Sequence, residues 1–237
     1  MKVLPRLIAR VWLGAGLTAF FAISVALARA EGANPQINQP YLNPNIQQWV
    51  ERFESEGRDI YDKRLAIVSA SGVRRGMTVA DIGAGTGLFT RLFAETVGPR
   101  GKVYAVDISK PFVDNILRMP RLKRQAPIIG IVNTQTDTLL PPDSIDLVFI
   151  SDTYHHFEQP EPTMRSIHRA LKRKGLLVVI DFKRDPGKSS AWVIEHVRGG
   201  KLETIAEIER IGFKLIEDRD FLRDNYFLKF KKIERME

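Results

Sequence analysis

The sequence contains no cysteine and only four histidines among its 237 residues. The absence of cysteine excludes disulfide bonds, thiolate metal sites and cysteine nucleophiles. No pair of histidines or carboxylates shows the spacing of a known metal-binding motif, so the sequence predicts no metal site. A Walker phosphate loop is also absent, because no Gly-Lys-Ser or Gly-Lys-Thr follows the glycine-rich stretch of the chain.

The excess of positive charge is small once the N-terminus is set aside. The chain carries 36 basic and 28 acidic residues, and four of the basic residues lie within residues 1–30, which contain no acidic residue. The 32 remaining basic residues therefore exceed the acidic ones by only four. This balance does not favour nucleic acid as a partner.

The first 30 residues have the three parts of a secretory signal peptide. Basic residues precede an uncharged apolar run at 11–28, and Ala28-Arg29-Ala30 has the small-x-small pattern of a cleavage site. An uncleaved membrane anchor is the main alternative, because the run approaches the roughly 20 residues that span a bilayer. A mitochondrial presequence fits less well, because the arginines are not spread along an amphipathic, serine-rich helix. The signal and the anchor both predict a domain outside the cytoplasm, in the periplasm or attached to a membrane through residues 11–28.

Composition divides the rest of the chain into a linker and one domain. Residues 31–45 are rich in proline, asparagine and glutamine, which predicts a flexible linker. Residues 46–237 are enough for one globular domain and too few for two. Their first part, 46–71, has the pattern of one or two amphipathic helices.

Strand-length apolar runs alternate with helical patterns from residue 77 onward. We expect strands at 77–82, 102–106, 128–132, 145–150 and 176–181, and helices at 87–97, 111–118, 160–172 and 189–211. This alternation predicts an α/β fold, with a doubly wound, mostly parallel sheet and helices on both faces. The last two apolar runs, 213–222 and 224–232, are expected to form a C-terminal antiparallel hairpin.

The segment VADIGAGTG, residues 79–87, is the strongest functional signal. Its glycines Gly83, Gly85 and Gly87 follow an expected strand and precede an expected helix, where they let a ligand approach the backbone closely. The next carboxylate at a strand end is Asp107, at the place where doubly wound folds hold a ribose. The two features together predict a site for a nucleotide-like cofactor.

The kind of cofactor follows from glycine spacing and charge. The spacing G-x-G-x-G differs from the G-x-G-x-x-G of dinucleotide sites, which disfavours a nicotinamide-linked oxidoreductase. Asp81 lies two residues before the first glycine, where a carboxylate would repel a pyrophosphate and attract an ammonium group. S-adenosylmethionine carries an ammonium and a sulfonium and no phosphate, so it fits this loop better.

Four segments resemble successive motifs of the class I S-adenosylmethionine-dependent methyltransferases: VADIGAGTG, VYAVD, DSIDLVFISDTYHHF and LKRKGLLVVIDF. The resemblance covers roughly residues 46–232 and points to the small-molecule branch that includes the ubiquinone/menaquinone biosynthesis methyltransferases. It implies a seven-stranded Rossmann-like sheet whose last strand is antiparallel and lies between the fifth and sixth. It also implies S-adenosylmethionine as the cofactor and a small or lipid-like molecule as the methyl acceptor.

The resemblance further implies which residues bind the cofactor. Those implied to contact its methionine part are Asp81, Gly83, Gly85 and Gly87. Asp107 would bind the ribose and Ile108 would lie against the adenine. Asp137 falls where the family often places an adenine-binding carboxylate, although the usual Gly-Asp pair is missing from residues 132–144.

Polar residues follow the strand expected at 145–150, at an edge of the sheet where ligands bind in such folds. The candidates there for cofactor or acceptor contact are Asp152, Tyr154, His155 and His156. Either histidine is a candidate catalytic base if the acceptor must lose a proton. Adjacent residues point apart, so one of the two is expected to be packed or to cap the next helix.

Two further pairs lie in regions that often cover the ligands in this family. Tyr61, with Arg64, precedes the first strand, where a helix can fold over the cofactor. His196 and Arg198 precede the last helix, where loops often cover the acceptor. Ordinary surface roles are the alternative for both pairs.

The sequence supports one main function and one alternative from another class. The main hypothesis is an exported methyltransferase acting on a small or lipid-like molecule. The alternative is an exported, non-catalytic S-adenosylmethionine- or nucleoside-binding protein that retains the fold, which export favours because the cofactor is made in the cytoplasm. Bases of nucleic acids are disfavoured as acceptors, because no Asn-Pro-Pro-Tyr or Asp-Pro-Pro-Tyr segment follows the fourth strand.

Overall fold

The computed structural model describes residues 32–233. The leader expected at 1–30, with its apolar run at 11–28, lies outside these residues. Within the described part of the chain, no helix is both long enough and apolar enough to cross a membrane.

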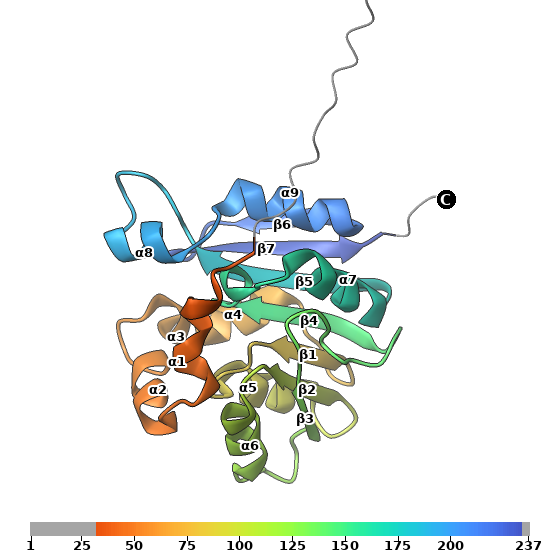
Figure 1. Ribbon diagram of the computed structural model, residues 1–237. Coiled ribbons are helices and arrows are strands. Elements are labelled where there is room, and N and C mark those ends of the chain that lie inside the picture. Colours follow the sequence, from red (N-terminus) through yellow and green to blue (C-terminus); the bar gives the residue numbers. More distant parts are fainter. Residues whose placement is uncertain (1–31, 234–237) are drawn as a thin grey trace, which may run out of the picture.

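Seven strands form one mixed sheet in the order β3-β2-β1-β4-β5-β7-β6 (Figure 1). The strands are β1 (Thr78–Ile82), β2 (Lys102–Asp107), β3 (Ile128–Val132), β4 (Ile145–Ser151), β5 (Leu171–Phe182), β6 (Phe213–Arg219) and β7 (Asn225–Lys232). The first five strands are parallel, and β7 pairs antiparallel with both β5 and β6. The fold predicted from the sequence, including the antiparallel last strand between the fifth and sixth, is confirmed.

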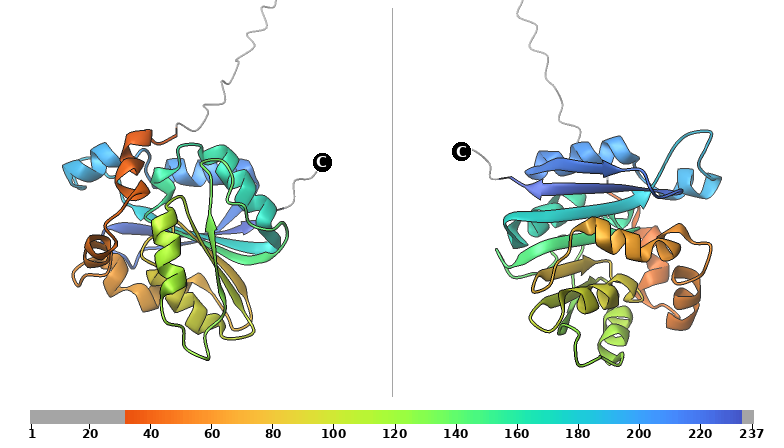
Figure 2. Two further views of the ribbon diagram at one scale, coloured as in Figure 1. Left: turned by 60° about the horizontal axis from the view of Figure 1, so that its bottom comes forward. Right: turned by 180° about the vertical axis from the view of Figure 1, so that it is seen from behind.

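Helices cover both faces of this sheet (Figure 2). They are α1 (Gln39–Leu42), α2 (Ile46–Phe53), α3 (Asp59–Asp62), α4 (Arg64–Ser71), α5 (Leu88–Val97), α6 (Lys110–Arg118), α7 (Pro160–Ala170), α8 (Ala191–His196) and α9 (Lys201–Ile211), with the short 3-10 helices η1 (Pro35–Asn38) and η2 (Tyr154–His156). Along β4, Phe149 packs into the core beneath α4 and α5, and its neighbour Ile150 into the core beneath α7 and α9. Because alternate residues of a strand face opposite sides, a strand segment buried on both faces is apolar, as residues 147–150 of β4 are.

The structure differs from the expected elements in two places. The helix expected at 189–211 is broken into α8 and α9, because Gly200 in extended conformation precedes α9 and serves as its N-cap. The strand expected at 176–181 begins five residues earlier, at Leu171, since the segment Leu171–Gly175 continues the pairing with β4 through a register shift.

The segment expected as a flexible linker is folded against the domain. It contains η1 and α1, and its Ala33 N–H donates a hydrogen bond to the Phe157 carbonyl at 2.9 Å. Asn38 is 3% exposed, and its side-chain amide donates to the His156 carbonyl and to Glu158. Residues 33–45 therefore pack against the domain, where the polar side chain of Asn38 has its partners.

We expect Asn38→Ala to lower the free energy of unfolding by about 3 kcal/mol, because three side-chain hydrogen bonds of roughly 1 kcal/mol each are lost. Chemical denaturation of the variant measures this loss. Gln36→Ala, an exposed position two residues earlier, is the matched control and should leave stability unchanged. Equal stability of the two variants would contradict the packing of this segment.

Candidate active site

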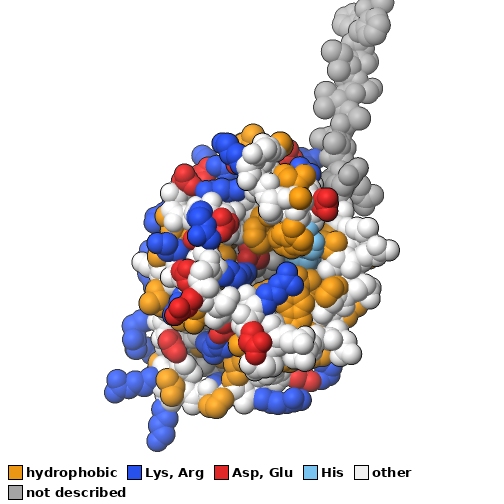
Figure 3. Space-filling model, turned by 90° about the vertical axis from the view of Figure 1, so that its left-hand side faces the viewer, with side chains coloured by type: hydrophobic (Ala, Val, Ile, Leu, Met, Phe, Trp, Pro, Cys, Tyr) orange, Lys and Arg blue, Asp and Glu red, His pale blue; other side chains and the backbone are white. Residues whose placement is uncertain are grey.

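A cavity of about 300 Å³ lies where β1, β2 and β4 end. Its mouth is hollowed into the face seen in Figure 3, where apolar and histidine side chains border it. The three strands are parallel neighbours, so their carboxyl ends meet at one edge of the sheet. The volume is within the usual range for small-molecule sites.

The loop after β1 presents its backbone to the cavity. Gly83 has φ +71°, and a Cβ atom there would overlap the side chain of Thr153, so only glycine fits. Gly85 has φ +51°, and a Cβ there would point to the ring of Phe53 at 3.6 Å. Gly87, at φ +84°, is the N-cap of α5. The loop thus brings main-chain atoms, rather than side chains, to the ligand.

Asp107 ends β2 and lies beside this loop, as the sequence predicts. It is 6% exposed, and its carboxylate accepts hydrogen bonds from the Gly85 N–H at 2.9 Å and the Ser109 N–H at 2.8 Å. Ile108 also lines the cavity. The predicted cofactor loop and the predicted ribose carboxylate therefore form one wall.

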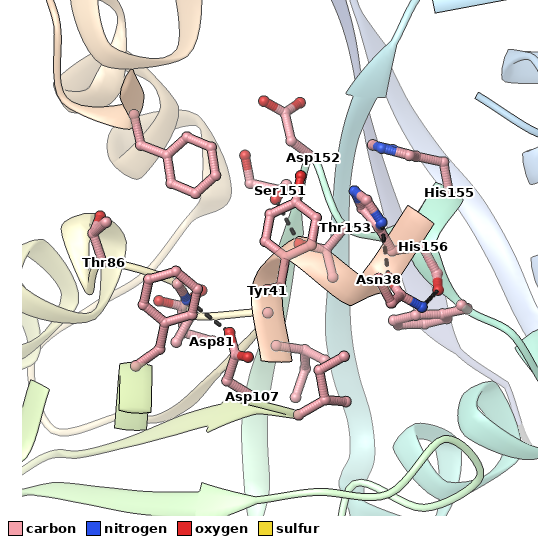
Figure 4. A pocket seen from close by; sticks show the side chains of 18 of the residues that line it. Asn38, Tyr41, Asp81, Thr86, Asp107, Ser151, Asp152, Thr153, His155 and His156 are labelled. Atoms are coloured by element: carbon pink, nitrogen blue, oxygen red, sulfur yellow. Dashed lines mark hydrogen bonds between the residues drawn. The ribbon is translucent and has the colours of Figure 1, made fainter. Parts of the chain in front are cut away.

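Asp81 lies at the base of the same wall and is 3% exposed (Figure 4). The Thr90 hydroxyl donates a hydrogen bond to its carboxylate at 2.6 Å. Burial raises the pKa of Asp81 to about 7 and that of Asp107 to about 6, in each case against hydrogen bonds that lower it. A cationic ligand would favour the ionised form of both carboxylates, so the loop favours a cation over a phosphate.

These shifts predict a pH dependence of stability. A carboxyl whose pKa is raised in the folded protein contributes stability that is present below its unfolded value of 3.8 and is lost as pH rises through its folded value. Asp81→Asn should therefore become more stable relative to the parent chain as pH rises from 4 to 7, by up to about 1.4 kcal/mol per pH unit. Chemical denaturation of both chains across this range measures the difference in their free energies of unfolding. If this difference did not change with pH, the raised pKa of Asp81 would be contradicted.

Asp152 follows β4 and lines the cavity, but both of its oxygens have partners. The Arg58 guanidinium donates to one oxygen at 2.5 Å and the Asn225 amide to the other at 2.6 Å. Burial raises the pKa of Asp152, and the charge of Arg58 opposes that shift. Asp152 therefore joins the segment before α3 to β4 and β7, and its predicted cofactor contact stays a prediction.

His155 and His156 both line the cavity, contrary to the expectation that adjacent residues point apart. They lie in η2, and their ring centroids are 4.2 Å apart. Asp181 accepts hydrogen bonds from the His155 N–H at 3.0 Å and contacts the His155 Nδ1 at 2.6 Å. Burial, with the neighbouring His155 and His196, lowers the pKa of His156 to about 2, so His156 is a weak base at neutral pH. Of the two, His155 is the better candidate for accepting a proton.

Several predicted residues do not line the cavity. Asp137 pairs with Arg169 at 2.8 Å and accepts a hydrogen bond from the Leu139 N–H, and its predicted adenine contact stays a prediction. The Tyr61 ring packs on the core, with the Arg64 guanidinium 4.2 Å from its centroid. The Tyr154 hydroxyl donates to Glu207 at 2.7 Å.

The Arg198 guanidinium also binds Glu207, at 2.8 and 2.9 Å, which gives it a structural role. His196 is not part of the cavity lining, but its ring lies 5.3 Å from that of His155 and 5.2 Å from that of His156.

Sequence reasoning missed an aromatic part of the wall. The missed lining residues include Asn38, Tyr41, Phe53, Phe182 and Trp192. Trp49 and Phe53 are four residues apart, and that spacing was the available signal for an aromatic helix face. The Tyr41 ring lies 4.6 Å from that of Trp49 and 5.0 Å from that of His156, and nothing local to its polar segment indicates this packing.

Comparison with known proteins agrees with this geometry. Residues 80–179 match the family model described as a methyltransferase domain. This range contains the glycine loop, Asp107 and both cavity histidines. The chain is therefore similar to methyltransferase domains over this range.

Sequence relatives of this chain include two curated Salmonella proteins, each named ubiquinone/menaquinone biosynthesis C-methyltransferase UbiE. The protein of Salmonella arizonae is 37% identical over 167 residues, which cover 68% of this chain and 62% of that protein. The protein of Salmonella paratyphi B is 38% identical over 127 residues, or 52% of this chain and 49% of that protein. The matches thus span less than two thirds of each relative's length.

Solved structures share the fold of this chain at low sequence identity. A SAM-dependent methyltransferase of Aquifex aeolicus has a TM-score of 0.67 at 21% identity, over 81% of this chain and all of that one. The 4+2 cyclase SpnF has a TM-score of 0.64 at 15% identity, over 86% of this chain and 97% of that one. The family match and the neighbouring structures support S-adenosylmethionine as the cofactor.

The cavity residues fit this cofactor. The Gly85 backbone is open to the cavity, and the two buried carboxylates beside it suit a ligand with cationic groups and ribose hydroxyls. The Ser151 hydroxyl, in the cavity wall at the end of β4, is buried without a hydrogen-bond partner. A buried polar atom of this kind is usually satisfied by a ligand or water.

Proposed function

We propose that the chain transfers a methyl group from S-adenosylmethionine to a small or lipid-like acceptor that carries an aromatic ring. One observation carries the proposal: a single cavity joins the glycine loop and Asp107 to a second, aromatic part of the wall. In Figure 4, Asp81, Thr86 and Asp107 lie on one side, His155 and His156 on the other, and Ser151 and Thr153 between them. Such an arrangement can hold a methyl donor and an acceptor side by side.

The second part of the wall supports a planar acceptor. Its aromatic members are Tyr41, Phe157, Phe182 and Trp192. Rings of this kind bind planar apolar ligands through stacked or edge-to-face contacts. The relatives named as ubiquinone/menaquinone biosynthesis methyltransferases are consistent with a phenol or quinol ring as the acceptor.

The chain's own residues would act mainly by positioning. S-adenosylmethionine supplies an electrophilic methyl group when bound, and transfer of that group is an in-line displacement that depends on the orientation of the acceptor. The Gly83–Gly87 loop and Asp107 would hold the donor, and the aromatic wall would exclude water and orient the acceptor. His155, whose ring is fixed by Asp181, would take up the proton that an acceptor hydroxyl or ring carbon releases.

We also propose that the domain acts outside the cytoplasm. The support is the pattern of residues 1–30, with a basic start, an apolar run and a small-x-small end. A reporter enzyme that is active on only one side of the membrane, fused after residue 237, tests this location. Reporter activity confined to the cytoplasm would overturn it.

The transfer itself is tested with methyl-labelled S-adenosylmethionine and extracts that contain small molecules and lipids. With the parent chain, we expect the labelled methyl group to enter an organic-soluble aromatic product. With Gly85→Arg we expect no product, because the arginine side chain would occupy the space in which the cofactor binds. Tight cofactor binding without label in any extract would instead support the non-catalytic alternative. Gly57→Arg is the matched glycine control, because Gly57 also has a positive φ, of +89°, but lies on an exposed turn with open space around it.

A further inference from the structure

Three of the four histidines gather at the edge of the aromatic wall, although they come from two distant segments. His155 and His156 lie in η2, and His196 ends α8 about forty residues later. One ring nitrogen from each lies within 4.8 Å of those from the other two. The prediction of no metal site rested on spacing along the sequence, which does not detect a cluster assembled by the fold.

Hydrogen bonds fix which nitrogens of the cavity pair are free. The Asn38 amide nitrogen donates to two oxygens, which leaves its oxygen to accept from the His156 Nδ1–H at 3.0 Å. Asp181 in the same way holds the His155 Nδ1 at 2.6 Å. The Nε2 atom of each ring therefore keeps a lone pair.

The third ring completes the set. The His196 Nε2 is buried and has no hydrogen-bond partner. The ring is stacked on Trp192, with centroids 4.4 Å apart and planes at 20°, which fixes its orientation. A buried imidazole nitrogen without a partner, beside two others with free lone pairs, is the donor arrangement that a metal ion requires.

We propose that His155, His156 and His196 bind a divalent transition-metal ion of the zinc class through their Nε2 atoms. A three-imidazole set is typical of zinc sites that keep a fourth position open for water or substrate. Zinc–nitrogen distances of about 2.0–2.1 Å place tetrahedral ligands about 3.4 Å apart, so the three rings would close by roughly an ångström on binding.

The surroundings support a metal site rather than a chance cluster. Asp181 behind His155 and Asn38 behind His156 provide the oxygen partners that metal-binding histidines usually have on their second nitrogen. The Asp181 carboxylate is 1% exposed and adds negative charge, while Arg52, which lines the cavity nearby, opposes a cation. Because His155 and His156 line the cavity, the open position would face the acceptor.

This site goes beyond the proposed methyl transfer. A metal ion there would acidify a hydroxyl group bound at its open position, a role that would replace proton uptake by His155. The cofactor loop and Asp107 share no residue with the cluster, so the metal proposal and the proposed function can fail independently.

The test uses the full-length chain without a histidine tag, freed of metal with a chelator and titrated with Zn²⁺ and, as a spectroscopic probe, with Co²⁺. We expect one ion of either metal per chain and the visible absorption of tetrahedral Co²⁺. His196→Phe keeps a ring to stack on Trp192 but removes the donor nitrogen, and should weaken Zn²⁺ binding by more than about 100-fold, since loss of a partner behind a ligand alone costs 10- to 100-fold. His168→Gln changes the one histidine outside the cluster and should bind as the parent does.

Two further measurements distinguish loss of the metal ligand from misfolding of the variant. His196→Ala repeats the test without a ring, and circular dichroism with S-adenosylmethionine titration establishes that each variant is folded. A parent chain that binds neither ion stoichiometrically would overturn the proposal. Binding that survives both changes at His196, or that is lost equally in His168→Gln, would overturn it as well.

Discussion

Asp107→Ala should weaken S-adenosylmethionine binding by roughly 100- to 10,000-fold, measured by calorimetric titration. The carboxylate would accept hydrogen bonds from the ribose, and two such bonds to a charged acceptor are worth about 1.5–3 kcal/mol each. The same carboxylate holds the Gly85 N–H and the Ser109 N–H, so its loss also releases the glycine loop that faces the cofactor.

Asp114→Ala is the matched control for this prediction. Asp114 is a partly exposed carboxylate on α6 that pairs with Lys110 one turn earlier, and its loss should leave cofactor affinity unchanged. Asp107→Asn, which keeps one oxygen acceptor, should fall between alanine and the parent chain. A folded Asp107→Ala chain with an affinity within about threefold of the parent would exclude Asp107 from the cofactor site.

His155→Gln should lower the rate of methyl transfer by about 100- to 10,000-fold while leaving cofactor affinity nearly unchanged, because positioned acid–base groups contribute about that much. Glutamine can keep the hydrogen bond to Asp181 but cannot take up a proton at neutral pH. The measurement is incorporation of labelled methyl groups under conditions that saturate the cofactor. His168→Gln should retain full activity.

Metal chelation separates the two roles open to His155. If His155 acts directly as the base, removing metal from the parent chain leaves the transfer rate unchanged. If it acts as a metal ligand, chelation lowers the rate of the parent chain and added Zn²⁺ restores it. Unchanged activity of His155→Gln would exclude both roles.

The sequence was most informative where one local constraint determines the structure. The Gly83 backbone conformation and the Thr153 contact admit only glycine. The carboxylate that ends β2 lies beside this loop, where it accepts a hydrogen bond from the Gly85 N–H. Apolar runs located the strands for the same reason, because residues 147–150 of β4 are buried on both faces and must be apolar.

The acceptor side was less predictable because its wall comes from three separated segments. Tyr41, His156 and Trp192 meet only after α1, η2 and α8 have packed around the strand ends. The histidine cluster has the same origin, since the expected long helix ends at His196, where Val197 is extended, and resumes as α9 only after Gly200. The Asp137 side chain pairs with Arg169 on α7, a contact that the sequence did not indicate, and its cofactor role stays a prediction.

Only a short length of chain connects the apolar run at 11–28 to the part of the domain that borders the cavity. Ala33 is buried and hydrogen-bonded beside η2, and it follows Ala28, the end of the apolar run, by five positions. Five residue steps span at most about 18 Å. A chain that kept its leader in a membrane would therefore hold the mouth of this cavity within reach of the lipid surface, so that a hydrophobic acceptor could enter from the bilayer while the cofactor arrives from water.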